Sequence, residues 1–142
     1  LKSFLPFQKM HIYNQTILPS LDYKHDGYIF IPENCKILLG THTTLFKWKP
    51  QYDNTIDFHI NDKEELMLQK ASTLVKTLNK LDKTTEYKNC IIECKCADVA
   101  KRLWTFIQVR PDKTLPNSLY TFRKTMLNIK ENISLTEFFT DV

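Results

Sequence analysis

The sequence predicts an α+β fold, because strand-like and helix-like segments both occur along the chain. Thr55–Ile60 alternates polar and apolar residues, which is the pattern of a strand with one buried face. Between Ala71 and Leu81 the apolar residues follow helical spacing instead, so we expect a helix there. With 142 residues, 42% of them hydrophobic and 25% charged, the chain is long and apolar enough to bury a core.

Further strands are expected where short apolar runs stop at turns or prolines. These runs are Tyr28–Pro32, Thr44–Lys49, Cys90–Cys96 and Leu103–Arg110. Asn117–Ser118 predicts the start of a helix, and Ser134–Glu137 is a capping-box pattern that predicts a last short helix. The alternating strand pattern ends at Ile60, and the residues 61–65 that follow are polar. We therefore expect a domain boundary between residues 60 and 65.

Composition excludes several classes of protein. Gly27 and Gly40 are the only glycines, so neither a phosphate-binding P-loop nor a Rossmann fingerprint can be built. No stretch approaches 18 consecutive apolar residues, so no membrane-spanning helix is expected. Lys and Arg (20) outnumber Asp and Glu (16), and the net charge of +4 suits a partner that carries phosphates. The chain starts without Met or a signal-peptide layout, as the middle of a longer protein would.

The cysteines do not predict a metal site. Cys90, Cys94 and Cys96 lack the paired spacing of a zinc knuckle. In an extended strand these three share one face with Ile92, so we interpret them as buried, reduced thiols. Such thiols favour a reducing compartment.

The stretch YKHDGYIF, residues 23–30, has two interpretations. Lys24 begins a Lys-x-Asp-Gly pattern, which surrounds the nucleophile of enzymes that charge a lysine with a nucleotide. Asp26 and Gly27 can equally form a turn that runs directly into an apolar strand.

The stretch KWKP places Lys47 and Lys49 two residues apart, so on a strand both ammonium groups point the same way. Like charges held together cost free energy unless an anion lies between them, and phosphate is the usual anion. The alternative is an exposed strand face with solvated lysines.

A second cationic group follows the strand 103–110. Arg110, Asp112 and Lys113 lie in a turn that Pro111 and Pro116 constrain. A guanidinium fork and an ammonium group, oriented by a carboxylate, suit a polyphosphate tail. The alternative is a charged turn with a local salt bridge of well under about 1 kcal/mol.

In order, these pieces resemble three successive motifs of the covalent nucleotidyltransferase superfamily, and within it the mRNA capping enzymes. The motifs are Asp26–Phe30, Phe46–Pro50 and Arg110–Asn117, with Asp57–Phe58 and Cys90–Lys95 as the matching flanks. The versions KWKP and DKTLPN resemble the capping enzymes more than the ligases. Position 29 is Ile where the nucleophile motif has Arg, so Lys24 is interpreted as a chance match.

The resemblance covers about Phe4 to Val142 and refines the expected fold. It implies the C-terminal strands of an ATP-grasp-like nucleotidyltransferase domain of the ligase and capping type (residues 1–60), an OB-fold barrel (61–117) and C-terminal helices that pack back on both (118–142). Residues 62–70 are few for the first OB strands, so either the barrel is trimmed or residues are absent near 70–71.

The resemblance implies GMP transfer from GTP, through a lysyl-GMP intermediate, to the 5′-diphosphate end of RNA. The nucleophile and the guanine-stacking residue would lie upstream of this chain. By carry-over, Asp26 helps to hold Mg²⁺ or Mn²⁺, and Lys47 and Lys49 contact the α-phosphate of GTP. Arg110 and Lys113, with Asp112, clamp the β- and γ-phosphates from a mobile OB-fold lid.

One position departs from the family pattern. Many capping enzymes have a second Arg where this chain has Gln108, so a phosphate contact is weaker here or comes from Lys101 or Arg102.

The family also implies RNA triphosphatase and the RNA polymerase II tail as partners, no membrane, and a nuclear location, or a cytoplasmic one if the protein is viral. Two other functions remain open. One is an ATP-dependent polynucleotide ligase. The other is a non-catalytic OB-type module that binds nucleic acid on Trp48 or Trp104.

Overall fold

A computed structural model describes residues 4–36, 38–40 and 42–139. The chain divides into two compact units. The first unit combines residues 1–48 with 134–142, and the second is Lys49–Ile133. Each unit is described by itself.

The first unit contains short helical turns and a two-stranded antiparallel sheet. The strand β1 (Tyr28–Phe30) pairs with β2 (Phe46–Trp48), and both lie inside runs that the sequence predicts as strands. The helical turns are η1 (Phe7–Lys9), α1 (Met10–Ile12), η2 (Tyr13–Ile17), η3 (Leu18–Ser20) and η5 (Leu135–Phe139).

Aromatic rings hold the first unit together. The ring of Phe30 lies 5.3 Å from that of Phe138, and the ring of Tyr28 lies 5.9 Å from that of Trp48. The predicted capping box is confirmed, because the backbone N–H of Ser134 donates to Glu137 Oε1 at 2.7 Å at the start of η5. This local bond fixes the turn that carries Phe138 against the hairpin.

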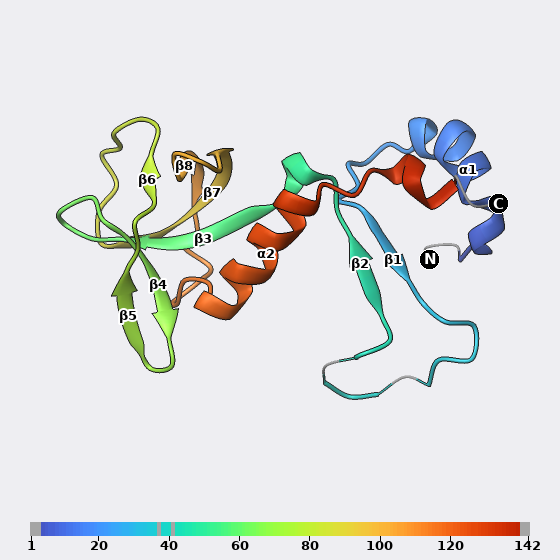
Figure 1. The fold of residues 1–142 in the computed structure, drawn as a ribbon, viewed down its shortest axis with the longest axis horizontal. Coiled ribbons are helices and arrows are strands. Elements are labelled where there is room, and N and C mark those ends of the chain that lie inside the picture. Colours follow the sequence, from blue (N-terminus) through green and yellow to red (C-terminus); the bar gives the residue numbers. More distant parts are fainter. Residues whose placement is uncertain (1–3, 37, 41, 140–142) are drawn as a thin grey trace. The chain divides into compact units, whose positions relative to one another are not determined.

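The second unit is a six-stranded sheet with one helix, α2 (Leu119–Glu131). The strand order is β5-β4-β3-β7-β8-β6. The elements are η4 (Gln51–Asp53), β3 (Thr55–Ile60), β4 (Leu66–Lys70), β5 (Thr73–Lys76), β6 (Lys80–Leu81), β7 (Cys90–Asp98) and β8 (Leu103–Val109). Figure 1 shows α2 crossing beside β3 within this unit.

The sheet closes into a barrel. Its two edge strands, β5 and β6, are consecutive in the chain and only residues 77–79 separate them. β5 pairs with β4 at one edge of the sheet in an antiparallel arrangement. After the short link, β6 pairs with β8 at the other edge in a parallel arrangement. If β5 and β6 are counted as two halves of one bent strand, the barrel has five strands, which is an OB-like arrangement.

The barrel core follows from the alternation in β3. Ile56, Phe58 and Ile60 are fully buried, and the rings of Phe58 and Trp104 meet edge to face at 5.1 Å. Leu66, Leu68, Ile92, Cys94 and Ile129 complete this core. Burial raises the pKa of the Cys94 thiol to about 12, so the thiol stays protonated as the sequence predicted for a buried cysteine.

The predicted helix over residues 71–81 is wrong. Ala71 has a φ of 52° and turns the chain, so that Thr73–Lys76 pairs with β4 as an edge strand. Leu74 is 39% exposed and Leu78 is 71% exposed, so the apolar spacing does not mark one buried helical face. The barrel needs these residues as a strand because they join its two edges.

The strand Thr55–Ile60, which the sequence-based limits assign to the first domain, pairs with β4 and β7 in the barrel. The helix α2 belongs to the second unit and η5 to the first. The domain limits 1–60, 61–117 and 118–142 stay predictions. Within the described residues, no helix is both long and apolar enough to span a bilayer.

The cap of α2 gives a first test. Ser118 Oγ accepts from the backbone N–H of Thr121 at 3.0 Å, and Ser118→Ala removes this acceptor. We expect the free energy of unfolding to fall by about 1 kcal/mol. Urea denaturation measures it, with the exposed turn residue Ser72→Ala as the control, for which less than about 0.5 kcal/mol is expected. Equal effects of the two substitutions would contradict the cap.

Candidate phosphate-clamp site

The outer face of the barrel carries a row of polar side chains across three neighbouring strands. Asp57 on β3 lies directly opposite Glu93 on β7, and Glu93 lies opposite Gln108 on β8. Asp57 is only 5% exposed. Two carboxylates opposite each other on neighbouring strands repel, so this row needs cations to be stable.

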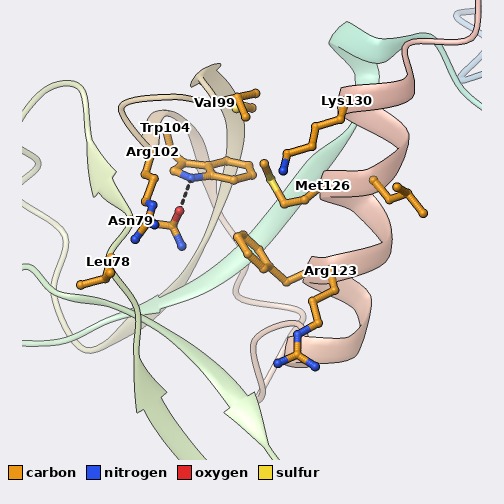
Figure 2. A pocket seen from close by; sticks show the side chains of 11 residues that line it. Leu78, Asn79, Val99, Arg102, Trp104, Arg123, Met126 and Lys130 are labelled. Carbon is orange, nitrogen blue, oxygen red and sulfur yellow. Dashed lines mark hydrogen bonds between the residues drawn. The ribbon is translucent and has the colours of Figure 1, made fainter.

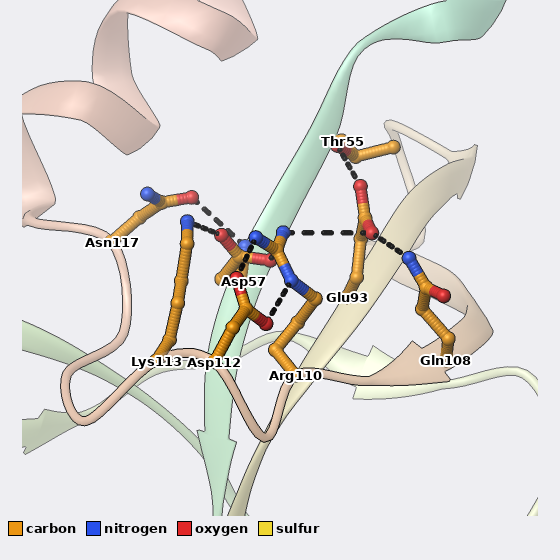
Figure 3. A network of polar contacts seen from close by, with 8 residues as sticks. All are labelled: Thr55, Asp57, Glu93, Gln108, Arg110, Asp112, Lys113 and Asn117. Carbon is orange, nitrogen blue, oxygen red and sulfur yellow. Dashed lines mark hydrogen bonds and ion pairs between the residues drawn. The ribbon is translucent and has the colours of Figure 1, made fainter.

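Arg110 and Lys113 supply these cations from the turn after β8 (Figure 3). Arg110 Nη1 lies 3.2 Å from Asp57 Oδ1 and 3.6 Å from Glu93 Oε2. The Lys113 ammonium contacts the other oxygen of Asp57. The backbone positions both residues, because Arg110 N–H donates to Ile91 O at 2.8 Å and Lys113 N–H donates to Arg110 O at 3.1 Å.

Asp112 holds the outer edge of the same guanidinium. Arg110 Nε donates to Asp112 Oδ1 at 2.9 Å and Nη2 donates to Oδ2 at 2.8 Å, which is a bidentate pair. The hydrogen bond from Arg110 holds the pKa of Asp112 at about 2. The same bond, with the nearby carboxylates, raises the pKa of Arg110 above its ordinary value. The guanidinium therefore stays charged wherever the protein is folded.

Glu93 is kept ionised by its neighbours. Burial alone would raise the pKa of its carboxyl, but hydrogen bonds from Gln108 and Thr55, each at 2.7 Å, and the charge of Arg110 outweigh burial. The pKa of Glu93 therefore lies below its ordinary value. Two cations thus face three carboxylates, those of Asp57, Glu93 and Asp112.

Asn117 joins the turn to the barrel. β3 pairs with β4 only at His59 and Ile60. Before His59, Asn117 lies between the two strands and bonds to Asp57 on β3 and Gln69 on β4. Its backbone N–H donates to Asp57 O and its Oδ1 accepts from Asp57 N–H, each at 2.8 Å. Its carbonyl oxygen accepts from Gln69 N–H at 3.0 Å. Within the stretch DKTLPN, Lys113 near the start and Asn117 at the end are therefore both held against Asp57.

The other predicted site residues lie outside this network. In the first unit, Lys47 Nζ lies 3.3 Å from Asp26 Oδ2, and both side chains are exposed. Lys49 belongs to the second unit, just after β2 ends. Lys24 is exposed in the segment before β1. The predicted contacts of Asp26, Lys47 and Lys49 with metal and α-phosphate stay predictions.

Gln108, which stands where many capping enzymes have a second Arg, has a hydrogen-bond partner in the same network. Gln108 Nε2 donates to Glu93 Oε2 at 2.7 Å, so a neutral amide occupies the position beside the carboxylate. Lys101 and Arg102 precede β8, whereas Arg110 follows it, so they lie at the opposite end of the strand. Neither can replace a cation next to Arg110.

Sequence comparison places the chain among known proteins. A family described as mRNA capping enzyme, C-terminal domain, matches residues 40–139. The chain belongs to this family. An mRNA-capping enzyme of Caenorhabditis elegans is 27% identical over 89% of the chain, and one of Mus musculus is 31% identical over 71%. An mRNA-capping enzyme subunit alpha of Schizosaccharomyces pombe is 24% identical over 88%.

The chain spans only part of each capping enzyme that it matches. The matched region is 23% of the worm protein, 37% of the fission yeast protein and 18% of the mouse protein. Family membership therefore assigns this chain to mRNA capping in general, as the three motifs predicted. The mixed α+β architecture with an OB-like barrel agrees with a capping-enzyme C-terminal domain.

In this capping-enzyme domain, five residues of the network were not among the predicted site residues: Thr55, Asp57, Glu93, Gln108 and Asn117. Asp57 and Glu93 entered only as flanks of motifs, and Asn117 entered as the end of the third motif and beside a helix cap, without a role in the site. One signal was available: Asp57 is a charged residue in the middle of a strand whose neighbours Ile56 and Phe58 are core residues. Such a carboxylate needs a partner, but its position along the chain does not say which one.

Asp57→Asn tests the role of the buried carboxylate. The substitution keeps the shape but leaves Lys113 and one side of Arg110 without their anion. We expect a loss of about 2 kcal/mol in the free energy of unfolding, less than for a fully buried pair because both cations reach solvent. Denaturant titration measures it, and the exposed Glu86→Gln serves as the control. A loss below about 0.5 kcal/mol would exclude Asp57 as an anchor.

The pKa of Asp112 gives a second test. Its folded-state pKa is about 2, below the ordinary value of 3.8, so the interaction stabilises the fold above about pH 4 and is lost as the pH falls toward 2. The carboxyl carbon of Asp112, followed by NMR, should titrate near pH 2. In Arg110→Gln it should titrate near its ordinary value. A normal titration in the unsubstituted chain would show that the bidentate pair does not form.

Proposed function

We propose that this chain is the C-terminal part of an mRNA guanylyltransferase, which transfers GMP from GTP through a lysyl-GMP intermediate to the 5′-diphosphate end of RNA. The nucleophile lies in a part of the protein outside this chain. The observation that carries the proposal is the pair of cations, Arg110 and Lys113, held by one buried carboxylate in a chain of the capping family.

The network suits a clamp for the β- and γ-phosphates of GTP. Asp112 has a side chain 60% exposed, so its bond to Arg110 is screened by water and a polyphosphate can displace it at little cost. Asp57 is 6% exposed at its side chain and stays as the anchor. Arg110 and Lys113 thus turn toward a phosphate while remaining charged and positioned.

The first unit contributes the other half of the proposed chemistry. The hairpin β1–β2 corresponds to the last strands of the nucleotidyltransferase domain. Its Lys47 contacts the α-phosphate, together with Lys49, the first residue of the second unit. Lys47 already lies beside the carboxylate of Asp26, so an anionic phosphate has an ordered ammonium group to bind. The cations stabilise charge that develops as pyrophosphate leaves.

A divalent metal, Mg²⁺ or Mn²⁺, would stabilise negative charge on the transferring phosphoryl group. Among the described residues, no three His, Cys, Asp or Glu side chains gather as a metal site. Asp26 fits as a single protein ligand, because Mg²⁺ in phosphoryl-transfer sites uses one or two carboxylates together with substrate phosphates. Asp26 would therefore bind metal only together with the nucleotide.

The proposed setting follows from the reaction. The substrates are GTP and RNA with a 5′-diphosphate end, which an RNA triphosphatase supplies, and the tail of RNA polymerase II is the proposed recruiting partner. The location is the nucleus, or the cytoplasm if the protein is viral. The OB-like barrel that carries Arg110 would be a lid that closes over GTP and opens for RNA.

Covalent labelling tests the proposal. A longer natural version of the protein and this 142-residue chain are each incubated with α-phosphate-labelled GTP or ATP and a divalent metal, then denatured. We expect label from GTP on the longer version alone, and unchanged labelling in Lys24→Ala. Label from ATP would support a polynucleotide ligase. No label, with RNA bound, would support a binding module.

One result would reverse the interpretation of the stretch before β1. If this chain by itself retains label and Lys24→Ala abolishes it, Lys24 is the nucleophile. The exposed Lys36→Ala is the matched control, and its labelling should equal that of the unsubstituted chain.

A further inference from the structure

The second unit contains a cavity that the proposed chemistry does not use. It has a volume of about 470 Å³ and lies where the barrel meets α2 (Figure 2). Its walls come from the link between β5 and β6, the turn between β7 and β8, and one face of α2. This volume is within the range of roughly 300–1,000 Å³ that ligand pockets occupy.

The most exposed apolar residues of the walls are leucines. Leu78 is 71% exposed and Leu127 is 54% exposed, and both line the cavity together with Met126. Trp104 also lines it but is only 1% exposed, and its indole N–H is occupied by Asn79 Oδ1 at 2.9 Å. The aromatic face of Trp104 is therefore not open for stacking, whereas the aliphatic side chains are open for contact.

Three cations surround this apolar surface. Arg102 stands on the barrel side, and Arg123 and Lys130 project from α2 (Figure 2). All three are exposed. No Asp or Glu lines the cavity, and among the described residues no carboxylate forms a salt bridge with any of the three. This differs from Arg110, which three carboxylates surround.

We propose that this cavity binds an acidic peptide segment of a partner protein that inserts aliphatic side chains. Its carboxylates would pair with Arg102, Arg123 and Lys130, while its aliphatic side chains would cover Leu78 and Leu127. The site is separate from the phosphate clamp, because Arg102 and Arg110 lie at opposite ends of β8. Peptide binding in this cavity does not depend on the proposed guanylyltransferase reaction.

Charge and surface chemistry together favour a peptide over a nucleic acid. Either partner would supply anions to Arg102, Arg123 and Lys130. Single-stranded nucleic acid, however, binds OB-type barrels by stacking bases on exposed aromatic rings. In this cavity the exposed apolar groups are the leucines, whereas the ring of Trp104 is buried and that of Phe122 is half-buried. Apolar side chains that insert into an apolar groove are one recurring mode of peptide recognition, and flanking charges of opposite sign add selectivity.

Fluorescence anisotropy with synthetic probes tests the proposal on the complete chain. The first probe is a labelled peptide of leucines spaced by glutamates. The second replaces its leucines with serine, the third replaces its glutamates with lysine, and the fourth is a labelled oligouridine of equal length. We expect the first probe to bind at least about tenfold more tightly than the other three, because only it offers both contacts.

Charge reversal on the protein locates the site. In Arg102→Glu/Arg123→Glu we expect the first probe to bind about tenfold more weakly, because two attractions become repulsions. Lys124→Glu is the matched control, since Lys124 is on the same helix but lies over the ring of Tyr120 and does not line the cavity. Its affinity should stay within about twofold. An equal loss in both variants would show non-specific attraction and overturn the proposal.

Leu127→Ser tests the apolar contact without changing charge. We expect it to weaken the first probe about fivefold and to leave the serine-substituted probe unchanged. The exposed Leu115→Ser is the control outside the cavity. Tighter binding of oligouridine than of the first probe, with the same sensitivity to charge reversal, would replace the proposal by a nucleic-acid site.

The indole N–H signals give an independent location, because the chain has only two tryptophans. The signal of Trp104, whose N–H bonds to Asn79 in the cavity wall, should shift in two-dimensional NMR when the first probe is added. The signal of Trp48, which belongs to the first unit, should not shift. Binding that leaves the Trp104 signal unchanged would place the peptide elsewhere and overturn the proposal.

Discussion

The facing carboxylates of Asp57 and Glu93 impose the main electrostatic constraint on this domain. They lie opposite each other on neighbouring strands, and Asp57 is almost completely buried. Such a pair is stable only when cations share it, and Arg110 and Lys113 come from the one turn that follows β8. The turn is thus tied to the middle of the barrel, and its cations are fixed before any ligand arrives.

The same network has a graded exposure, on which the proposed phosphate clamp depends. Asp57 is inside, Arg110 lies between, and Asp112 faces water. The inner contact orients the guanidinium, and the outer contact neutralises part of its charge. In the capping family this arrangement would let a single arginine remain ordered and still exchange Asp112 for phosphate oxygens.

Closure of the barrel decides where the other surfaces lie. Because only residues 77–79 join the two edge strands, the link carrying Leu78 and Asn79 must bend beside the turn that carries Arg102. The helix α2 then covers the barrel core with Ile129 and leaves Leu127 open. The cavity with its three cations is therefore a consequence of the short link between β5 and β6, and it lies at the opposite end of β8 from Arg110.

The sequence by itself determined the local features and the family. The alternation of Thr55–Ile60, the cap at Ser118 and the capping box at Ser134 depend on neighbours within a few residues, and the structure has each of them. The order of KWKP and DKTLPN indicated the capping family, because the order of motifs can be read from the sequence without the fold.

Only the tertiary structure decided which groups meet. Residues 71–81 have helical spacing, yet they form strands because pairing with β4 and β8 closes the barrel. Asp57 and Lys113 are 56 residues apart in sequence, and Asn117 joins Asp57 across 60. Pairing over such separations depends on the register of several strands, and no local propensity encodes it.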